Sequence, residues 1–220
     1  MDAPIVLSHK TAWLYYQVSG PNALGEDRDL PALAPARRTP MSFAKSIRQT
    51  LTMCGVNDNQ LDKLDILISF PSERTRSSAF RPHSYGAIIP ANELVSIAPG
   101  LLVVHPSLCF LQSASWMNEY EQLEFAYELC GNYLGPQQNQ SGYTKLVSLD
   151  NVQHLREAAK SHPSTKGIKQ TRRVLRMAKN NSRSPMETAL AMMLAEDRTR
   201  GGLGFKSFDL NKRVDIPLKH

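Results

Sequence analysis

Segments with the pattern of β-strands are confined to the first half of this chain, and helical periodicity takes over from Pro106. The strand candidates are short, apolar and bounded by prolines or by the Pro99-Gly100 turn. They are residues 64–70, 85–89 and 101–104, while residues 5–18 read as a strand end or loop that leads into a helix. This order predicts an α+β fold with a small N-terminal mixed sheet, accompanying helices and a helical middle.

Two helices are predicted from apolar spacing. Residues 41–54 place Phe43, Ile47 and Leu51 on one face, and Gly55 follows as a stop signal. A second stripe recurs at steps of three and four, with Gly131 as its C-terminal cap; its members are Trp116, Tyr120, Leu123, Tyr127 and Cys130. The polar residues that follow mark the best interior boundary. They divide the chain into an N-terminal α/β region with a helical end, residues 1–134, and a basic helical segment with the C-terminal element, residues 144–220.

The positive charge of the chain is concentrated in one segment. The net charge is +6, yet residues 156–183 hold nine basic side chains and a single acidic one, so this segment accounts for the whole excess. Residues 166–179 have the spacing of an amphipathic helix, with the cations on one face; these are Lys169, Arg172, Arg173, Arg176 and, less centrally, Lys179. Such a face attracts a phosphate backbone because counterions are released. The helix lacks aromatic residues for base stacking, which favours backbone contact with a duplex over reading of a single strand. A solvated helix face is the alternative.

A further helix has clear start signals at Ser184. Ser184 is an N-cap, Pro185 fits the first helical position, and Glu187 stands three residues after the cap, which completes a capping box. The capping role explains Glu187 better than a catalytic one. The apolar residues that follow form one face of this helix; they are Met186, Ala189, Leu190, Met193 and Leu194.

Several kinds of chemistry have no support in the sequence. No apolar run is long enough to span a bilayer, and the N-terminus lacks the pattern of a signal peptide, so a cytoplasmic protein without a membrane partner is expected. The three cysteines form no CxxC pair. The histidines show no metal-ligand spacing, which favours loop or capping roles, and we expect neither a metal site nor a cofactor. A nucleophile elbow and a Gly-rich phosphate loop are also absent.

Residues 182–215 resemble the start of a known nuclease domain. The order S-P-M-E-T, an apolar helix, a glycine turn and L-N-K-R-V-D is similar to the very-short-patch-repair-like endonuclease domains at the C-terminus of abortive-infection antitoxin-like proteins of actinobacteria. The segments LSHKTAWLYY, LDILISF, GLLVVHPSLCFLQSAS and ELCGNY agree with such proteins. The chain departs from them at His105-Pro106-Ser107, where relatives tend to have serine, proline and glutamate, so a weaker helix cap is expected there.

The resemblance implies a fold of the PD-(D/E)xK type, in which an aspartate and a Glu-x-Lys motif hold Mg²⁺. Only Glu187 and Asp215 match as weak catalytic candidates, so the C-terminal element is expected to be restriction-endonuclease-like but incomplete, with an exposed sheet edge at residues 205–216. The leading hypothesis is a nucleic-acid-binding bacterial protein, antitoxin-like or regulatory, with an inactive nuclease-like C-terminus. The alternatives are a residual metal-dependent endonuclease, which would need Mg²⁺, and an interaction module that docks an acidic protein partner.

Overall fold

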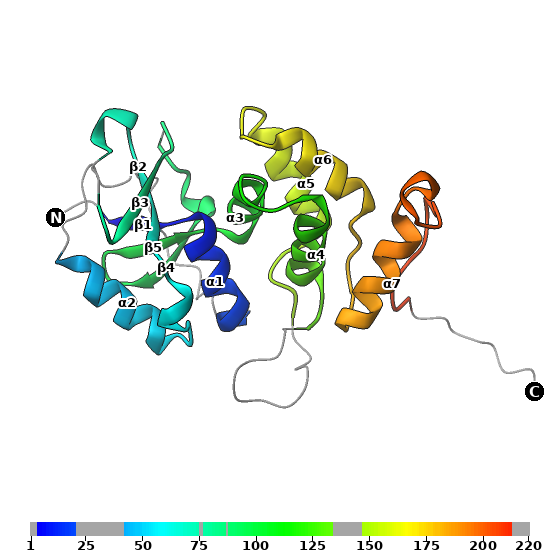
Figure 1. The fold of residues 1–220 in the computed structure, drawn as a ribbon, viewed down its shortest axis with the longest axis horizontal. Coiled ribbons are helices and arrows are strands. Elements are labelled where there is room, and N and C mark those ends of the chain that lie inside the picture. The colour runs from blue at the N-terminus through cyan, green and yellow to red at the C-terminus, as the bar shows by residue number, and fades with distance from the viewer. Residues whose placement is uncertain (1–3, 21–41, 75–76, 87, 134–146, 213–220) are drawn as a thin grey trace, which may run out of the picture.

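A five-stranded mixed sheet occupies the N-terminal part of the computed structural model, which describes residues 4–20, 42–74, 77–86, 88–133 and 147–212 (Figure 1). The strand order is β3-β2-β1-β5-β4. Pairs β1–β5 and β2–β3 are parallel, whereas β1–β2 and β4–β5 are antiparallel. The strands are β1 (Ile5–Leu7), β2 (Leu64–Ile68), β3 (Phe80–Ser84), β4 (Leu94–Ala98) and β5 (Leu101–Val104). The predicted α+β class with a mixed sheet is confirmed.

The predicted strands agree with the structure where every residue of the strand is buried. They disagree with it at the two edge strands of the sheet. Every residue of β2 and of β5 is buried, and both strands were expected. The strand predicted at residues 85–89 is wrong, because β2 pairs with Phe80–Ser84 instead. Pro82 is tolerated there since β3 is an edge strand. β4 was not predicted; it pairs with β5 across a turn in which Gly100 has a φ of 75°.

Seven α-helices lie within the described residues. They are α1 (His9–Ser19), α2 (Phe43–Met53), α3 (Pro106–Ser113), α4 (Glu119–Cys130), α5 (Val152–Ser161), α6 (Ile168–Met177) and α7 (Pro185–Ala195). Figure 1 shows α1 and α2 beside the sheet, α3 to α6 in the middle of the molecule and α7 at the far end. The helical middle and the helix predicted at residues 41–54 are therefore confirmed. No helix within the described ranges is long and apolar enough to cross a membrane.

The central helices share one core with the sheet. α4 packs against α3 and α6, and α5 packs against α3 and α6. A continuous cluster of buried side chains runs from Val6 of β1 to Ala191 of α7. This packing crosses the boundary predicted between residues 134 and 144, which itself lies outside the described residues.

The aromatic stripe expected between residues 116 and 130 is only partly correct. Trp116 precedes α4, and Tyr120 is exposed, so neither belongs to a continuous buried stripe. Leu123, Tyr127 and Cys130 are buried as expected. The helix begins instead with a capping box in which Asn118 accepts from the backbone N–H of Glu121 and Glu121 accepts from that of Asn118. Gly131 is its C-terminal cap, as predicted.

The C-terminal part differs most from expectation. α7 forms where predicted, but its expected apolar face is largely exposed to solvent; Met186 is 80% exposed and Met193 60%. The helix buries Thr188 and Ala191 instead. The exposed sheet edge expected at residues 205–216 is wrong for residues 205–212, which contain no strand, and the remainder lies outside the described residues. A restriction-endonuclease-like element therefore stays a prediction.

Candidate functional site

The cationic face of α6, defined here as Lys169, Arg172, Arg173 and Arg176, points into solvent. All four side chains are exposed, whereas Thr171, Val174 and Leu175 on the opposite side are buried. The 3.6-residue period separates the two sets cleanly, as the sequence predicts. α6 therefore holds its cations on a helix anchored by the core.

One carboxylate lies among these cations. Glu119 Oε1, at the start of α4, is 2.9 Å from Arg173 Nε and 3.3 Å from Arg200 Nη1. Arg172 donates to the carbonyl oxygen of Ala159 at 3.5 Å. Among the described residues, Lys169 and Arg176 form no ion pair. The cationic face of α6 therefore keeps most of its charge unneutralised by the protein.

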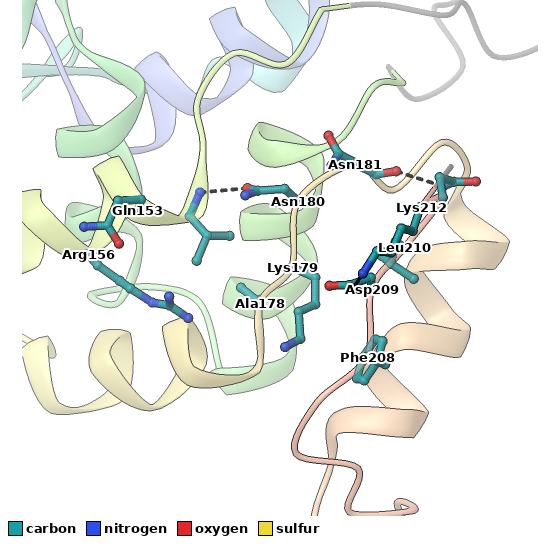
Figure 2. Close-up of a pocket in the computed structure, with 12 residues that line it drawn as sticks. Gln153, Arg156, Ala178, Lys179, Asn180, Asn181, Phe208, Asp209, Leu210 and Lys212 are labelled. Atoms are coloured by element: carbon teal, nitrogen blue, oxygen red, sulfur yellow. Dashed lines mark hydrogen bonds and ion pairs between the residues drawn. The ribbon is translucent and has the colours of Figure 1, made fainter. Parts of the chain in front are cut away.

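Lys179 lies beyond the end of α6 and faces a different environment. Its side chain is half-buried, and its Nζ is 5.1 Å from the centre of the Phe208 ring. Both line a cavity of about 600 Å³ between the end of α6, α5 and residues 208–212. Figure 2 shows Arg156 and Lys179 on either side of Ala178 in this cavity. The structure thus places Lys179 in a polar cavity next to the cationic face, not on it.

Glu187 has a structural role. Its backbone N–H donates to Ser184 Oγ at 3.2 Å, and its Oε2 accepts from the backbone N–H of Arg183 at 2.8 Å. Oε2 also accepts from Asn211 Nδ2 at 2.6 Å. Ser184 caps α7 as predicted, but the capping box is incomplete, because the Glu187 carboxylate accepts from the backbone N–H of Arg183, the residue before the N-cap, and not from that of Ser184. The second catalytic candidate, Asp215, lies outside the described residues, so no acidic pair with Glu187 can be described.

Four histidines, which were expected in loops or caps, form two clusters. In the first, the rings of His9 and His83 stack with centroids 3.5 Å apart. His83 Nε2 is 2.8 Å from Oδ1 of the buried Asp65, and Arg81 also reaches that carboxylate. Burial, then His83 and Arg81, lower the pKa of His9 to about 3. The loop expectation is wrong for His83, which lies in β3.

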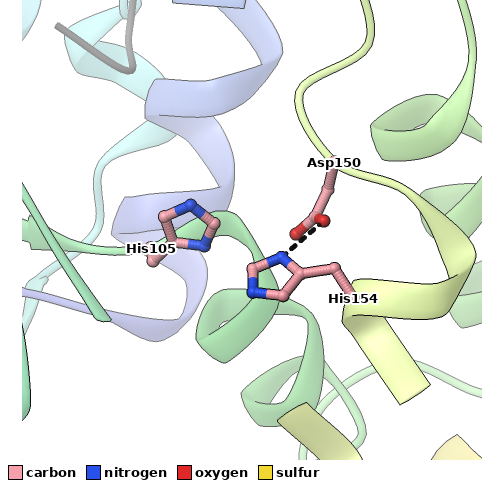
Figure 3. Close-up of side chains that lie close together, drawn as sticks. All are labelled: His105, Asp150 and His154. Carbon is pink, nitrogen blue, oxygen red and sulfur yellow. Dashed lines mark hydrogen bonds and ion pairs between the residues drawn. The ribbon is translucent and has the colours of Figure 1, made fainter. Parts of the chain in front are cut away.

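The second cluster contains His105, Asp150 and His154, whose ligand atoms all lie within 4.8 Å of one another. Asp150 Oδ1 is 2.8 Å from His154 Nδ1, and the rings of His105 and His154 are 5.4 Å apart (Figure 3). Burial and then His154 lower the pKa of His105 to about 4, and burial raises the pKa of Asp150. His105 caps α3, as a capping histidine should, but His154 lies within α5, where a loop or capping role is wrong.

The sequence did not predict this cluster, because only the spacings between histidines were considered and carboxylates were not counted as possible ligands. Asp150 and His154 are four residues apart, and their contact puts both on one side of the start of α5. That spacing is visible in the sequence once carboxylates are counted as ligands. His105 comes from a segment 45 residues earlier, so only the fold brings the three together.

Comparison of the chain with protein-family models, with curated proteins and with solved structures finds no match. What the protein does must therefore be inferred from the geometry of its own residues.

Proposed function

We propose that this protein binds nucleic acid through the phosphate backbone, with the cationic face of α6 as the contacting surface. The observation that carries the proposal is the exposure of four cations on one helix face with a single carboxylate, that of Glu119, among them. Neutralising phosphates with such a face releases condensed counterions, which supplies sequence-independent affinity. Arginine adds bidentate phosphate contacts that lysine cannot form.

The helix is well suited to present these cations in a fixed arrangement. Gln122 of α4 donates to Thr171 Oγ1 at 3.1 Å, and Gln170 donates to Gln122 Oε1 at 3.1 Å, so α6 is joined to α4 by hydrogen bonds. At the other end, Arg156 donates twice to the carbonyl oxygen of Leu175, at 2.7 and 3.2 Å. A rigid helix loses less conformational entropy on binding than a mobile basic segment would.

The neighbouring cavity extends the same surface. Arg156 and Lys179 supply cations there, and Asn180 and Asn181 supply amide groups. Lys212 also lines the cavity, but its charge is paired with Asp209 at 3.2 Å. These groups suit a phosphate or sugar that continues past the end of α6. Backbone contact with a duplex agrees with the absence of aromatic residues from α6. An antitoxin-like or regulatory role is what the resemblance adds to this proposal.

The test is fluorescence anisotropy of duplex DNA and duplex RNA over a salt series. We expect affinity to fall steeply with salt, with a slope of roughly −0.9 for each phosphate neutralised. The triple change of Arg172, Arg173 and Arg176 to alanine should weaken binding on all sequences and flatten that slope by about 2 to 3. A charge-matched control, Lys10, Lys45 and Lys206 to alanine, removes three exposed lysines from other elements and should leave the slope nearly unchanged.

Two results would contradict the proposal. An equal loss of affinity in both triple variants would mean that net charge alone, and not α6, attracts the nucleic acid. No binding at low salt would leave the cationic face of α6 as a surface for an acidic protein partner. Nicking of plasmid DNA in Mg²⁺ that disappears in Glu187→Gln would instead support the residual endonuclease.

A further inference from the structure

We infer that His105, Asp150 and His154 form a binding site for a divalent transition-metal ion such as Zn²⁺. Two imidazoles and one carboxylate are a ligand set that zinc and non-haem iron take in proteins. Mg²⁺ and Ca²⁺ prefer all-oxygen sites, so this site differs in kind from the Mg²⁺ site of a nuclease. The inference is independent of nucleic-acid binding by α6.

The three ligands come from well-fixed positions. His105 joins β5 to α3, and its backbone N–H donates to the carbonyl oxygen of Glu93 at 2.7 Å. The backbone N–H of Asp150 donates to the carbonyl oxygen of Leu129 at 2.9 Å. His154 lies in the first turn of α5, where its backbone N–H donates to the cap residue Asn151. The ion would therefore join the sheet to the helical middle.

Asp150 provides the observation that points to a ligand. The residue is only 7% exposed, and its Oδ2 is buried without a hydrogen-bond partner among the described residues. A buried carboxylate oxygen without a partner is destabilising, because it loses its hydrogen bonds to water and gains none in the fold. A cation bound by the Asp150 carboxylate would satisfy this oxygen.

Metal binding would rearrange the hydrogen bonds around the two imidazoles. His105 Nδ1 accepts from the backbone N–H of Ser107 at 3.3 Å and lies 2.9 Å from Ser107 Oγ, a hydroxyl that can donate to it or accept from it. Binding of the ion through Nε2 requires the proton on Nδ1, so His105 would give up the 3.3 Å cap contact and donate to Ser107 Oγ instead. His154 Nδ1 and Asp150 Oδ1 are 2.8 Å apart, so a deprotonated Nδ1 and the carboxylate can bind one ion from adjacent positions, with the ion in place of the proton that they share. The contact of His105 with Ser107 would then orient that ring.

The size of the cluster requires a small closure around the ion. In a tetrahedral site with bonds of about 2.0 Å, the ligand atoms lie roughly 3.3 Å apart. The ligand atoms of these three residues lie within 4.8 Å of one another, so they must come closer together to bind one ion. The side chain of His154 is 41% exposed, so it can move and the ion can enter from solvent. Three protein ligands leave a coordination position for water, as in catalytic zinc sites.

Metal binding is tested with the full chain after treatment with a chelator. Co²⁺ is titrated and followed by its visible absorption, and Zn²⁺ affinity is measured by competition with a chromophoric chelator. We expect one ion per chain and a Co²⁺ spectrum typical of four or five ligands. His105→Gln and His154→Gln should each lower Zn²⁺ affinity by about 100-fold or more. The control His162→Gln, at the other end of α5, should change it less than about threefold.

Circular dichroism of each variant shows whether it is folded, and His154→Gln is the safer variant because its side chain is partly exposed. A second readout is the melting temperature, which Zn²⁺ should raise in the unmodified protein and in His162→Gln but not in folded His154→Gln. Absence of Co²⁺ binding by the unmodified protein would overturn the inference. So would Zn²⁺ affinity that folded His154→Gln retains or that His162→Gln loses equally.

Discussion

The stacked pair of His9 and His83 predicts a loss of stability in mild acid. The two rings stack 3.5 Å apart, and His83 Nε2 lies 2.8 Å from Asp65 Oδ1. Burial, His83 and Arg81 keep the pKa of His9 at about 3 in the folded protein, against 6.5 for an unperturbed histidine. His9 is therefore neutral in the fold and takes up a proton on unfolding wherever the pH lies between these values.

The sign and the size of the effect follow from proton linkage. Below pH 6.5 the unfolded chain binds a proton that the folded chain does not bind, so stability falls as the pH is lowered and the loss continues down to about pH 3. With about 1.36 kcal/mol for each pKa unit, the contribution of His9 between pH 8 and pH 5 is roughly 2 kcal/mol.

The measurement is urea unfolding of the unmodified protein and of His9→Asn at pH 8, 7, 6 and 5. Asparagine removes the titrating ring, and it is among the residues that best tolerate the φ of 48° at this position. Carboxylates and the other histidines are present in both proteins. Their contribution to the pH dependence therefore largely cancels when the two free energies of unfolding are subtracted. Between pH 8 and pH 5, we expect the free energy of unfolding to fall by about 2 kcal/mol more in the unmodified protein than in the variant. Parallel pH curves would refute the reasoning.

Two further predictions concern the contacts of the central helices. Gly167 precedes α6 with a φ of 82°, and a Cβ there would lie 2.5 Å from Ala114 Cβ, so Gly167→Ala should lower the free energy of unfolding by about 2 kcal/mol or more. Gly86→Ala has a similar φ of 76° with no atom near its Cβ and should cost only about 1 kcal/mol in urea unfolding; equal losses would exclude the clash. Burial and Glu124 raise the pKa of Glu128 to about 7, so its charge destabilises the fold above pH 4.5 and fully above pH 7. Because Glu128 is half-buried, Glu128→Gln should raise the free energy of unfolding by only about 1 kcal/mol at pH 8 and should not change it at pH 4.5. Thermal unfolding at the two pH values measures this, and a gain in stability at both would contradict the prediction.

Features that depend on neighbouring residues could be predicted from the sequence. The start of α7 is marked by Ser184 and Pro185, and the structure has these residues as the N-cap and the first residue of the helix. The two faces of α6 follow from period alone. β5 was found because its four residues are all apolar and buried.

Features that depend on distant partners could not be predicted in this way. β3 and β4 are edge strands with mixed polar and apolar residues, and their positions are set by hydrogen bonding to β2 and β5. The Asp150–His154 pair is visible as a four-residue spacing, but the addition of His105 depends on the packing of α3 against α5, which the sequence does not show. The pKa of His9 likewise depends on a ring that is 74 residues away in the sequence.

The exposed face of α7 shows what periodicity leaves open. Spacing correctly indicates a helix with an apolar side, but it does not say which other segment covers that side. The described residues pack on the small side chains instead: Ala191 is fully buried, and Thr188 Oγ1 lies 2.9 Å from Tyr133 Oη and 2.8 Å from Ser182 Oγ. A threonine and an alanine let the helix approach closely, where Met186 and Leu190 would hold it away. The orientation of α7 therefore follows from close packing and hydrogen bonding of its small side chains, and not from burial of the largest apolar area.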